Sequence, residues 1–562
     1  MLARRNDGPH RMRRQTAIAL VTIALAAAPL AASVALPAAS AGAGPVEVLG
    51  PITTDDTVAP ESGSTVVDNG ALAVEDGEQQ AEFPTGVSNV TVRSDGTERG
   101  RWLEFDSALL GLRAVNHVTL PPNYGADAPP YGTLYRLHGT RGEAGSLVEP
   151  PPAPPASSTS GAAASGGVTG QATSNADTAS GSTEQFLVVA LDEGAGWCDR
   201  CWWVDGRNGQ GVLAESHLLH EVIPVVEATF NVRTDRGGRA VYGTSMGGIG
   251  ALIQAFRHPD VFAYVASQSG SPSQGEHRDE SQVHQDNLYY VSYLRFQGYP
   301  DPVTEPIAYR NIDVVTLAPQ VIGTDLEIVL WANDGCMPPY DPQPQPVGDP
   351  DCIRTSRLEP MDGFHMVNER GIRNQNEVLA ARLADVGVPF RLETGHGRHG
   401  VSSMYPDHVI PDLNRLFSTS PVDPAVFSYK TTDRLFSIWG YDVEVLERPN
   451  EEFLHLLGAQ RDGRELTLAG TGQARLRTPE LARPGTAVQI TVVRENAGSM
   501  SFTVTAGADC RVALELDLGP VRELDQRQDL SRAGSFDFPR TRVELAPDAP
   551  LPTALASRSA CR

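Results

Sequence analysis

The chain has almost no lysine and, beyond its N-terminal region, no long apolar run. Its 562 residues include a single lysine, Lys430, and 69 acidic residues outnumber 45 basic ones, which gives a formal net charge of −24. Such a surface repels phosphate backbones and anionic membranes, so we expect no nucleic-acid partner. After residue 41, no stretch approaches the roughly eighteen apolar residues of a membrane span. We therefore expect no transmembrane anchor once the N-terminal region is removed.

The N-terminal region has the pattern of a secretory signal peptide. A basic segment is followed by an apolar run from 16 to 36 and by the small residues Ala39, Ser40 and Ala41. A membrane anchor is the alternative, but Pro29 interrupts the apolar run. The pattern predicts cleavage of residues 1–41 and a secreted protein, either extracellular or associated with the cell envelope.

The cysteines are few, and export makes them interpretable. An oxidising compartment favours disulfides, and the six cysteines fall into three local pairs: Cys198 with Cys201, Cys336 with Cys352, and Cys510 with Cys561. The CxxC at 198–201 has a redox centre or half of a zinc site as alternatives. No second CxxC or suitably spaced histidine accompanies it, so we expect disulfides rather than a metal site. The mechanism inferred below implies neither a metal nor an organic cofactor.

Apolar patterning divides the rest of the chain into an α/β region and an all-β region. Strand-like runs, such as 133–137 and the apolar run 186–191, alternate with helical patterns over 88–420, which predicts an α/β domain with a mainly parallel sheet. Strict alternation of apolar residues over 425–547 predicts a sandwich-like all-β accessory domain.

Three further segments lack apolar periodicity. Residues 42–87 are acidic and are expected to form a flexible N-terminal segment, and 150–184 is a low-complexity insert of Pro, Ala, Ser, Gly and Thr within the α/β domain. Residues 548–562 form a C-terminal tail.

A candidate nucleophile lies in the sequence Gly243-Thr244-Ser245-Met246-Gly247. This G-x-S-x-G motif follows a predicted strand at 240–242 and precedes a predicted helix that continues to about 257. A sharp turn between such elements can present the Ser245 hydroxyl above the sheet edge. The alternative is a glycine-rich turn without chemistry.

Candidate partners for Ser245 lie after two later strands. The loop after the strand at 389–393 offers His396 and His399 as bases, and the strand at 326–331 is followed by Asp334, the first choice for the acid. Asp341, Asp349 and Asp351, in the loop that a Cys336–Cys352 disulfide would close, are alternatives for the acid. The amides of Met246 and Thr140 are the expected oxyanion-hole donors.

These motifs together resemble a known family. The run Leu137-His138-Gly139-Thr140-Arg141, the segment Glu221-Val222-Ile223-Pro224, the SMGG elbow at 245–248 and the Gly-His loop resemble the esterase D-type α/β-hydrolases, which include S-formylglutathione hydrolases, feruloyl esterases and secreted mycolyltransferases. The resemblance covers about 105–418. It implies the α/β-hydrolase fold, favours His399 over His396 as the base, and places Arg141 beside the oxyanion hole.

The chain departs from that family in its long insert, its added β domain and a tryptophan-rich CxxC segment. Trp197, Trp202 and Trp203 in this segment either line a substrate site or pack as a structural plug.

The sequence as a whole predicts a secreted serine carboxylic-ester hydrolase that works through an acyl-enzyme. Its partner is an ester substrate, with cell-envelope carbohydrate or lipid as a further candidate. The alternatives are a mycolyltransferase-like acyltransferase and a non-catalytic envelope-binding protein on a hydrolase scaffold.

Overall fold

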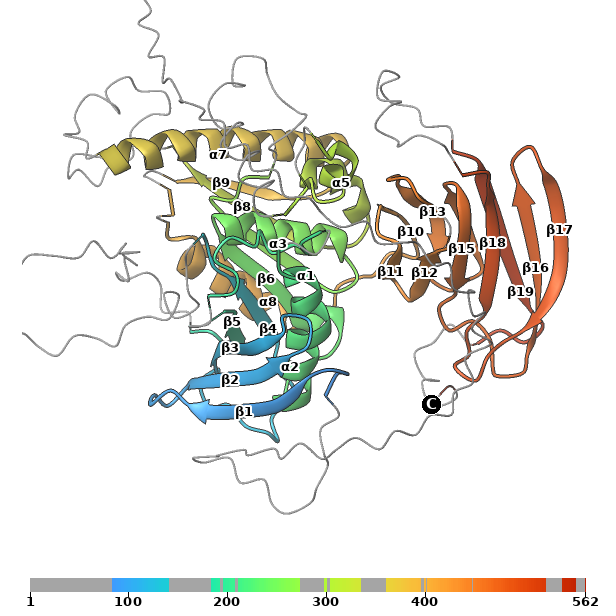
Figure 1. Ribbon diagram of the computed structural model, residues 1–562. Coiled ribbons are helices and arrows are strands. Elements are labelled where there is room, and N and C mark those ends of the chain that lie inside the picture. Colours follow the sequence, from blue (N-terminus) through green and yellow to red (C-terminus); the bar gives the residue numbers. More distant parts are fainter. Residues whose placement is uncertain are drawn as a thin grey trace, which may run out of the picture. The chain divides into compact units, whose positions relative to one another are not determined.

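The computed structural model describes most of the α/β region and most of the all-β region (Figure 1). These segments are 83–140, 183–192, 196–207, 211–272, 298–300, 304–334, 360–395, 399–400, 402–446, 448–521, 538–551 and 561. The predicted signal peptide, nearly all of the low-complexity insert, His396, Arg141 and the Cys336–Cys352 pair lie outside the described residues.

A nine-stranded mixed sheet forms the first region, in the order β1-β2-β3-β5-β4-β6-β7-β8-β9. Figure 1 shows it running from β1 at the bottom of the view to β9 near the top. Its strands are β1 (Ser88–Ser94), β2 (Gly100–Ser107), β3 (Leu112–Thr119), β4 (Thr133–Leu137), β5 (Leu187–Ala190), β6 (Arg239–Thr244), β7 (Tyr264–Gln268), β8 (Glu327–Asn333) and β9 (Arg391–Gly395). Strands β1, β2, β3 and β5 pair antiparallel to one another in this order. All pairings from β5 through β4 to β9 are parallel.

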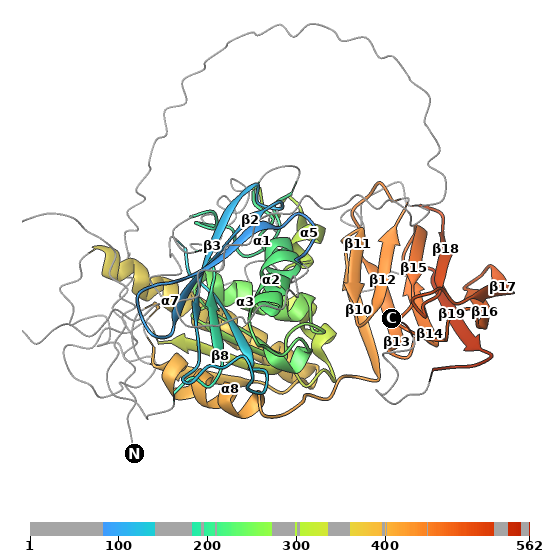
Figure 2. The ribbon, with the colours of Figure 1, turned by 90° about the horizontal axis from the view of Figure 1, so that it is seen from below.

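Helices cover both faces of the parallel part, which explains its continuous apolar strands. The side chains of Val241 and Val265 pack with α2 and α3 in one core, whereas those of Ala240 and Tyr264 pack with α8 in another. Figure 2 shows the ribbons of these helices around the sheet. The helical segments of this region are α1 (Ala214–His217), η2 (Leu218–Val222), α2 (Ile223–Thr229), η3 (Arg236–Gly238), α3 (Met246–Arg257), α5 (Pro306–Arg310), α6 (Val314–Leu317), η4 (Ala318–Val321), α7 (Pro360–Asp385), η6 (Tyr405–Val409) and α8 (Ile410–Leu416).

Two antiparallel sheets make up the all-β region and share one hydrophobic core of their own. The six-stranded sheet has the order β10-β13-β14-β19-β16-β17, and the four-stranded sheet has the order β11-β12-β15-β18. Their strands are β10 (Val426–Thr431), β11 (Leu435–Ile438), β12 (Tyr441–Val445), β13 (Leu454–Gln460), β14 (Glu465–Ala469), β15 (Gly472–Arg477), β16 (Ala487–Arg494), β17 (Gly498–Thr505), β18 (Ala513–Gly519) and β19 (Arg540–Pro547). The broad prediction of an α/β sheet followed by an all-β region is confirmed.

Several details differ from the sequence prediction. The sheet is mixed because β1, β2 and β3 extend it by antiparallel pairing. The strand β2 was not predicted, since its charged residues interrupt the apolar pattern.

Two of the predicted disulfides fall within the described residues. Cys198 is bonded to Cys201, and Cys510 is bonded to Cys561. Among the described residues, no helix is long and apolar enough to cross a membrane, and no group of three or more His, Cys, Asp or Glu side chains is arranged to hold a metal ion.

Candidate active site

Ser245 lies at a sharp turn between β6 and α3. Its φ is 58°, in the left-handed region that non-glycine residues seldom adopt. Its amide donates a hydrogen bond to the carbonyl oxygen of Gln268 over 2.8 Å, and its own carbonyl accepts the Ile249 amide over 3.1 Å. Such backbone strain persists only where the surroundings hold it, and it is common at functional sites.

Glycines allow this turn to close. A Cβ atom added at Gly243 would lie 2.1 Å from the carbonyl oxygen of Gly247, and one added at Gly247 would lie 1.9 Å from the carbonyl oxygen of Leu137. Both neighbours are backbone atoms, which cannot rotate aside as a flexible side chain can. The two glycines of the motif are therefore required by packing.

We expect Gly247→Ala to destabilise the fold by about 3 kcal/mol, the upper part of the usual range for overpacking. Chemical denaturation followed by circular dichroism measures this change. Gly125→Ala is the matched control, because a Cβ atom there would meet only Ala128 at 4.0 Å. Equal stability of the two variants would contradict the packing argument.

His399 lies next to Ser245 and connects it to a buried carboxylate. Its Nε2 atom is 2.8 Å from the Ser245 hydroxyl oxygen, and its Nδ1 atom is 2.6 Å from Oε2 of Glu369. The imidazole follows β9 and has 11% of its side-chain surface exposed, whereas the Glu369 side chain is fully buried. The structure thus brings together serine, histidine and glutamate.

Two further hydrogen bonds hold the Glu369 carboxylate in place. Its Oε1 atom accepts the Ser269 hydroxyl and the Asn333 amide, each over 2.8 Å. Ser269 follows β7 and Asn333 ends β8, so neighbouring strands position this α7 side chain. Because Oε1 receives both donors, Oε2 faces His399.

The structure corrects the expected acid. Asp334 was expected to contact the histidine, but Nδ1 of His399 bonds to Glu369 instead. The backbone of Asp334 extends the β8–β9 pairing, with its amide 3.0 Å from the carbonyl oxygen of Gly395. The three alternative aspartates, Asp341, Asp349 and Asp351, lie outside the described residues. Sequence reasoning missed Glu369 because it occurs within a helical pattern, away from any strand end.

The two expected oxyanion donors lie in segments next to Ser245. Met246 is the first residue of α3, and its side chain is buried. Thr140 follows Gly139, where an added Cβ atom would lie 3.3 Å from Cβ of Ser245. The loop after β4 therefore passes directly beside the serine.

The tryptophan-rich segment belongs to the core rather than to an exposed substrate wall. Trp197, Trp202 and Trp203 are at most 9% exposed and pack in the main core cluster. Trp203 packs edge-on against Trp197, with ring centroids 5.8 Å apart. Of the two roles considered from the sequence, the structure favours packing.

Comparison with known proteins matches the part of the chain that contains Ser245. Residues 107–297 match a family model described as a putative esterase. This region is similar to esterases. Esterase Rv1288 of Mycobacterium tuberculosis strain H37Rv is 27% identical over 184 residues, which make up 32% of this chain and 34% of that protein. The resemblance inferred from the motifs is confirmed, and the matched region spans about a third of the length of this curated esterase.

Solved structures of low sequence identity also resemble part of this chain. The S-formylglutathione hydrolase of Agrobacterium tumefaciens is 15% identical with a TM-score of 0.37, and the match covers 58% of this chain and 99% of that one. MPT51 (FbpC1) of Mycobacterium tuberculosis is 14% identical with a TM-score of 0.34, covering 56% and 95% of the two chains. These TM-scores are low, and the similarity to esterases is carried by the two sequence matches.

Proposed function

We propose that the protein is a secreted serine carboxylic-ester hydrolase. The observation that carries this proposal is the continuous set of hydrogen bonds from Ser245 through His399 to Glu369. A serine hydroxyl is a weak nucleophile and needs an adjacent base, which in turn needs a group that orients it. The three side chains supply these parts in this order.

The hydrogen bonds define the roles of the two ring nitrogens of His399. Oε2 of Glu369 accepts a hydrogen bond from the N–H group at Nδ1. Nε2 therefore carries no proton and presents its lone pair to the Ser245 hydroxyl. When the serine oxygen attacks an ester carbonyl, Nε2 takes the hydroxyl proton and then gives it to the leaving alcohol. The buried Glu369 carboxylate stabilises the imidazolium that forms between these two transfers.

The negative charge that develops on the carbonyl oxygen needs hydrogen-bond donors. The Met246 amide lies at the N-terminus of α3, where the helix dipole favours an anion. The Thr140 amide, in the loop beside Ser245, is the proposed second donor. A water molecule then attacks the acyl-enzyme and gives a proton to Nε2 of His399. Nε2 returns a proton to the Ser245 oxygen as its bond to the acyl group breaks, so the product is the free acid.

Catalysis is favoured over a non-catalytic binding role because of the distances at Ser245. A scaffold without activity has no need for an imidazole 2.8 Å from a serine held at a φ of 58°. Acyl transfer to an envelope sugar uses the same acyl-enzyme and differs only in the acceptor. Water has the advantage in concentration unless an acceptor is bound next to the acyl group.

The proposal is tested by covalent labelling with a fluorophosphonate, followed by peptide mass spectrometry. We expect one adduct per chain, on Ser245, and release of free acid from short-chain nitrophenyl esters. Heat-denatured protein is the control, because it has the same serines but not the assembled site. A folded protein that gains no adduct would contradict the proposed function.

A further inference from the structure

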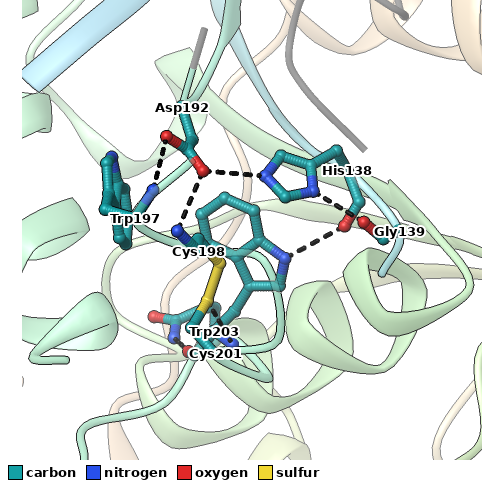
Figure 3. The surroundings of a disulfide bond; sticks show 8 residues. His138, Gly139, Asp192, Trp197, Cys198, Cys201 and Trp203 are labelled. Carbon is teal, nitrogen blue, oxygen red and sulfur yellow. Dashed lines mark hydrogen bonds and ion pairs between the residues drawn. A yellow bond between two sulfur atoms is a disulfide. The ribbon is translucent and has the colours of Figure 1, made fainter. Parts of the chain in front are cut away.

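The loop that carries Thr140 is held by a network of buried side chains, which contacts the carbonyl oxygens of His138 and Gly139 (Figure 3). The side chains of His138 and Asp192 are both fully buried. The His138 ring contacts the next residue of the chain, with Nδ1 2.7 Å from the carbonyl oxygen of Gly139. Its other nitrogen, Nε2, is 3.4 Å from Oδ2 of Asp192. The ring therefore connects the Gly139 carbonyl to a carboxylate deep in the core.

The bond to the Gly139 carbonyl sets the direction of the Thr140 amide. Since a carbonyl oxygen only accepts, Nδ1 of His138 must donate. The Gly139 carbonyl and the Thr140 amide belong to one trans peptide group, in which C=O and N–H point in opposite directions. When His138 holds the oxygen, the Thr140 N–H is directed away from His138.

A second bond fixes the preceding peptide group in the same loop. The indole Nε1 of Trp203 donates to the carbonyl oxygen of His138 over 3.2 Å. Trp203 is itself fixed, because its carbonyl accepts the Gln254 side chain and its amide lies 3.3 Å from Sγ of Cys201. Two successive carbonyls of the loop are thus anchored by buried side chains.

The anchor depends on the turn closed by the Cys198–Cys201 disulfide. Asp192 accepts the amides of Trp197 over 3.2 Å and of Cys198 over 2.9 Å. Trp202 and Trp203 have φ values of 54° and 58°, which are costly for bulky side chains. Both cysteines are buried, so the disulfide serves as a brace rather than as an exchanging redox centre.

We propose that His138 is a positioning residue for the oxyanion hole, and that Asp192 and the Cys198–Cys201 disulfide hold it in place. The inference rests on the proposed function and adds to it the groups that orient the Thr140 donor. These residues act through the Gly139–Thr140 peptide and do not touch the substrate. Their loss weakens stabilisation of the transition state more than binding of the ester.

The test compares His138→Leu with His138→Asn in the full chain. Leucine removes the donor, whereas the asparagine amide nitrogen can replace Nδ1 near the same position. We expect His138→Leu to lower kcat by about tenfold to a hundredfold while KM changes by less than about threefold, since removing a true oxyanion donor costs about a hundredfold or more. We expect His138→Asn to recover most of the lost kcat. The exposed His220 supplies the control, and His220→Leu should leave kcat unchanged.

A second pair of variants tests the brace. Cys198→Ser with Cys201→Ser should lower kcat by about tenfold and weaken inhibition by a boronic acid, whose tetrahedral adduct needs the same donors. Cys510→Ser with Cys561→Ser removes the other described disulfide and should change neither quantity. The boronic-acid affinity separates positioning from a general loss of stability, which thermal denaturation measures in parallel.

The outcomes distinguish this inference from the proposed function. If the wild-type protein hydrolyses no ester, the proposed function is wrong. If it does, and folded His138→Leu keeps the wild-type kcat, the positioning role alone is wrong. Should His138→Leu fail to fold, kcat is measured instead for Asp192→Asn and for the Cys198→Ser, Cys201→Ser variant. A wild-type kcat in both of these variants would overturn the inference.

Discussion

Ser245→Ala is expected to reduce ester hydrolysis by several orders of magnitude, to the level that the remaining site supports without a nucleophile. The hydroxyl is the group on which the proposed acyl-enzyme forms, and its Oγ is bonded to His399. The substitution removes only the hydroxyl oxygen. The backbone keeps the left-handed φ of residue 245. The measurement is kcat on a short-chain nitrophenyl ester, together with the loss of fluorophosphonate labelling.

Ser437→Ala is a matched control for this change, because Ser437 is an exposed serine on β11 in the all-β region. It should retain full activity and full labelling. Substantial turnover by folded Ser245→Ala would exclude Ser245 as the nucleophile.

The second large effect is expected at the acid. Glu369→Gln should lower kcat by about a thousandfold or more, because a neutral amide cannot stabilise the imidazolium and can present its NH2 group to Nδ1, which favours the wrong tautomer of His399. Asp334→Asn should have a much smaller effect, since it leaves the carboxylate that contacts His399 intact. Parallel kcat measurements on the two variants decide between the two carboxylates.

His399→Ala provides the upper limit for this comparison and should be as damaging as Ser245→Ala, because the residues act as one unit. If Asp334→Asn proves the more damaging of the two acid variants, the assignment from the hydrogen bonds is incorrect. The serine and histidine assignments would remain.

Much of this architecture was predictable from the sequence because its signals are local. The apolar run at 186–191 and the G-x-S-x-G motif each report a strand or a turn within a few residues, and both occur where they were expected. The alternating pattern of residues 512–518 likewise gives the strand β18. Local periodicity and glycine placement were sufficient for these elements.

Glu369 was not predictable in this way, because its role depends on tertiary packing. Its carboxylate is positioned by hydrogen bonds from the Ser269 hydroxyl and the Asn333 amide. These residues are 100 and 36 positions away in the sequence. The expectation for Asp334 assumed that the acid directly follows a strand. The backbone of Asp334 instead pairs with Gly395, and no sequence pattern distinguishes these two arrangements.

The brace behind Thr140 was partly visible in the sequence. The CxxC and its tryptophans were identified, but their connection to the oxyanion loop depends on His138 and Asp192, which lie 54 residues apart. His138 belongs to the Leu-His-Gly run, and Asp192 belongs to no motif that the sequence analysis identified.

The long sequence separations within the proposed triad determine how small a working fragment can be. Ser245 and His399 are 154 residues apart, and Glu369 comes from a helix between them. The segment recognised as esterase-like ends at residue 297, so a polypeptide limited to it would contain the serine but neither the base nor the acid. The proposed hydrolysis therefore requires the completed sheet up to β9 and the loop after it. Any cut between Ser245 and His399 that lets the fragments separate should abolish the activity, even when the turn at Ser245 is intact.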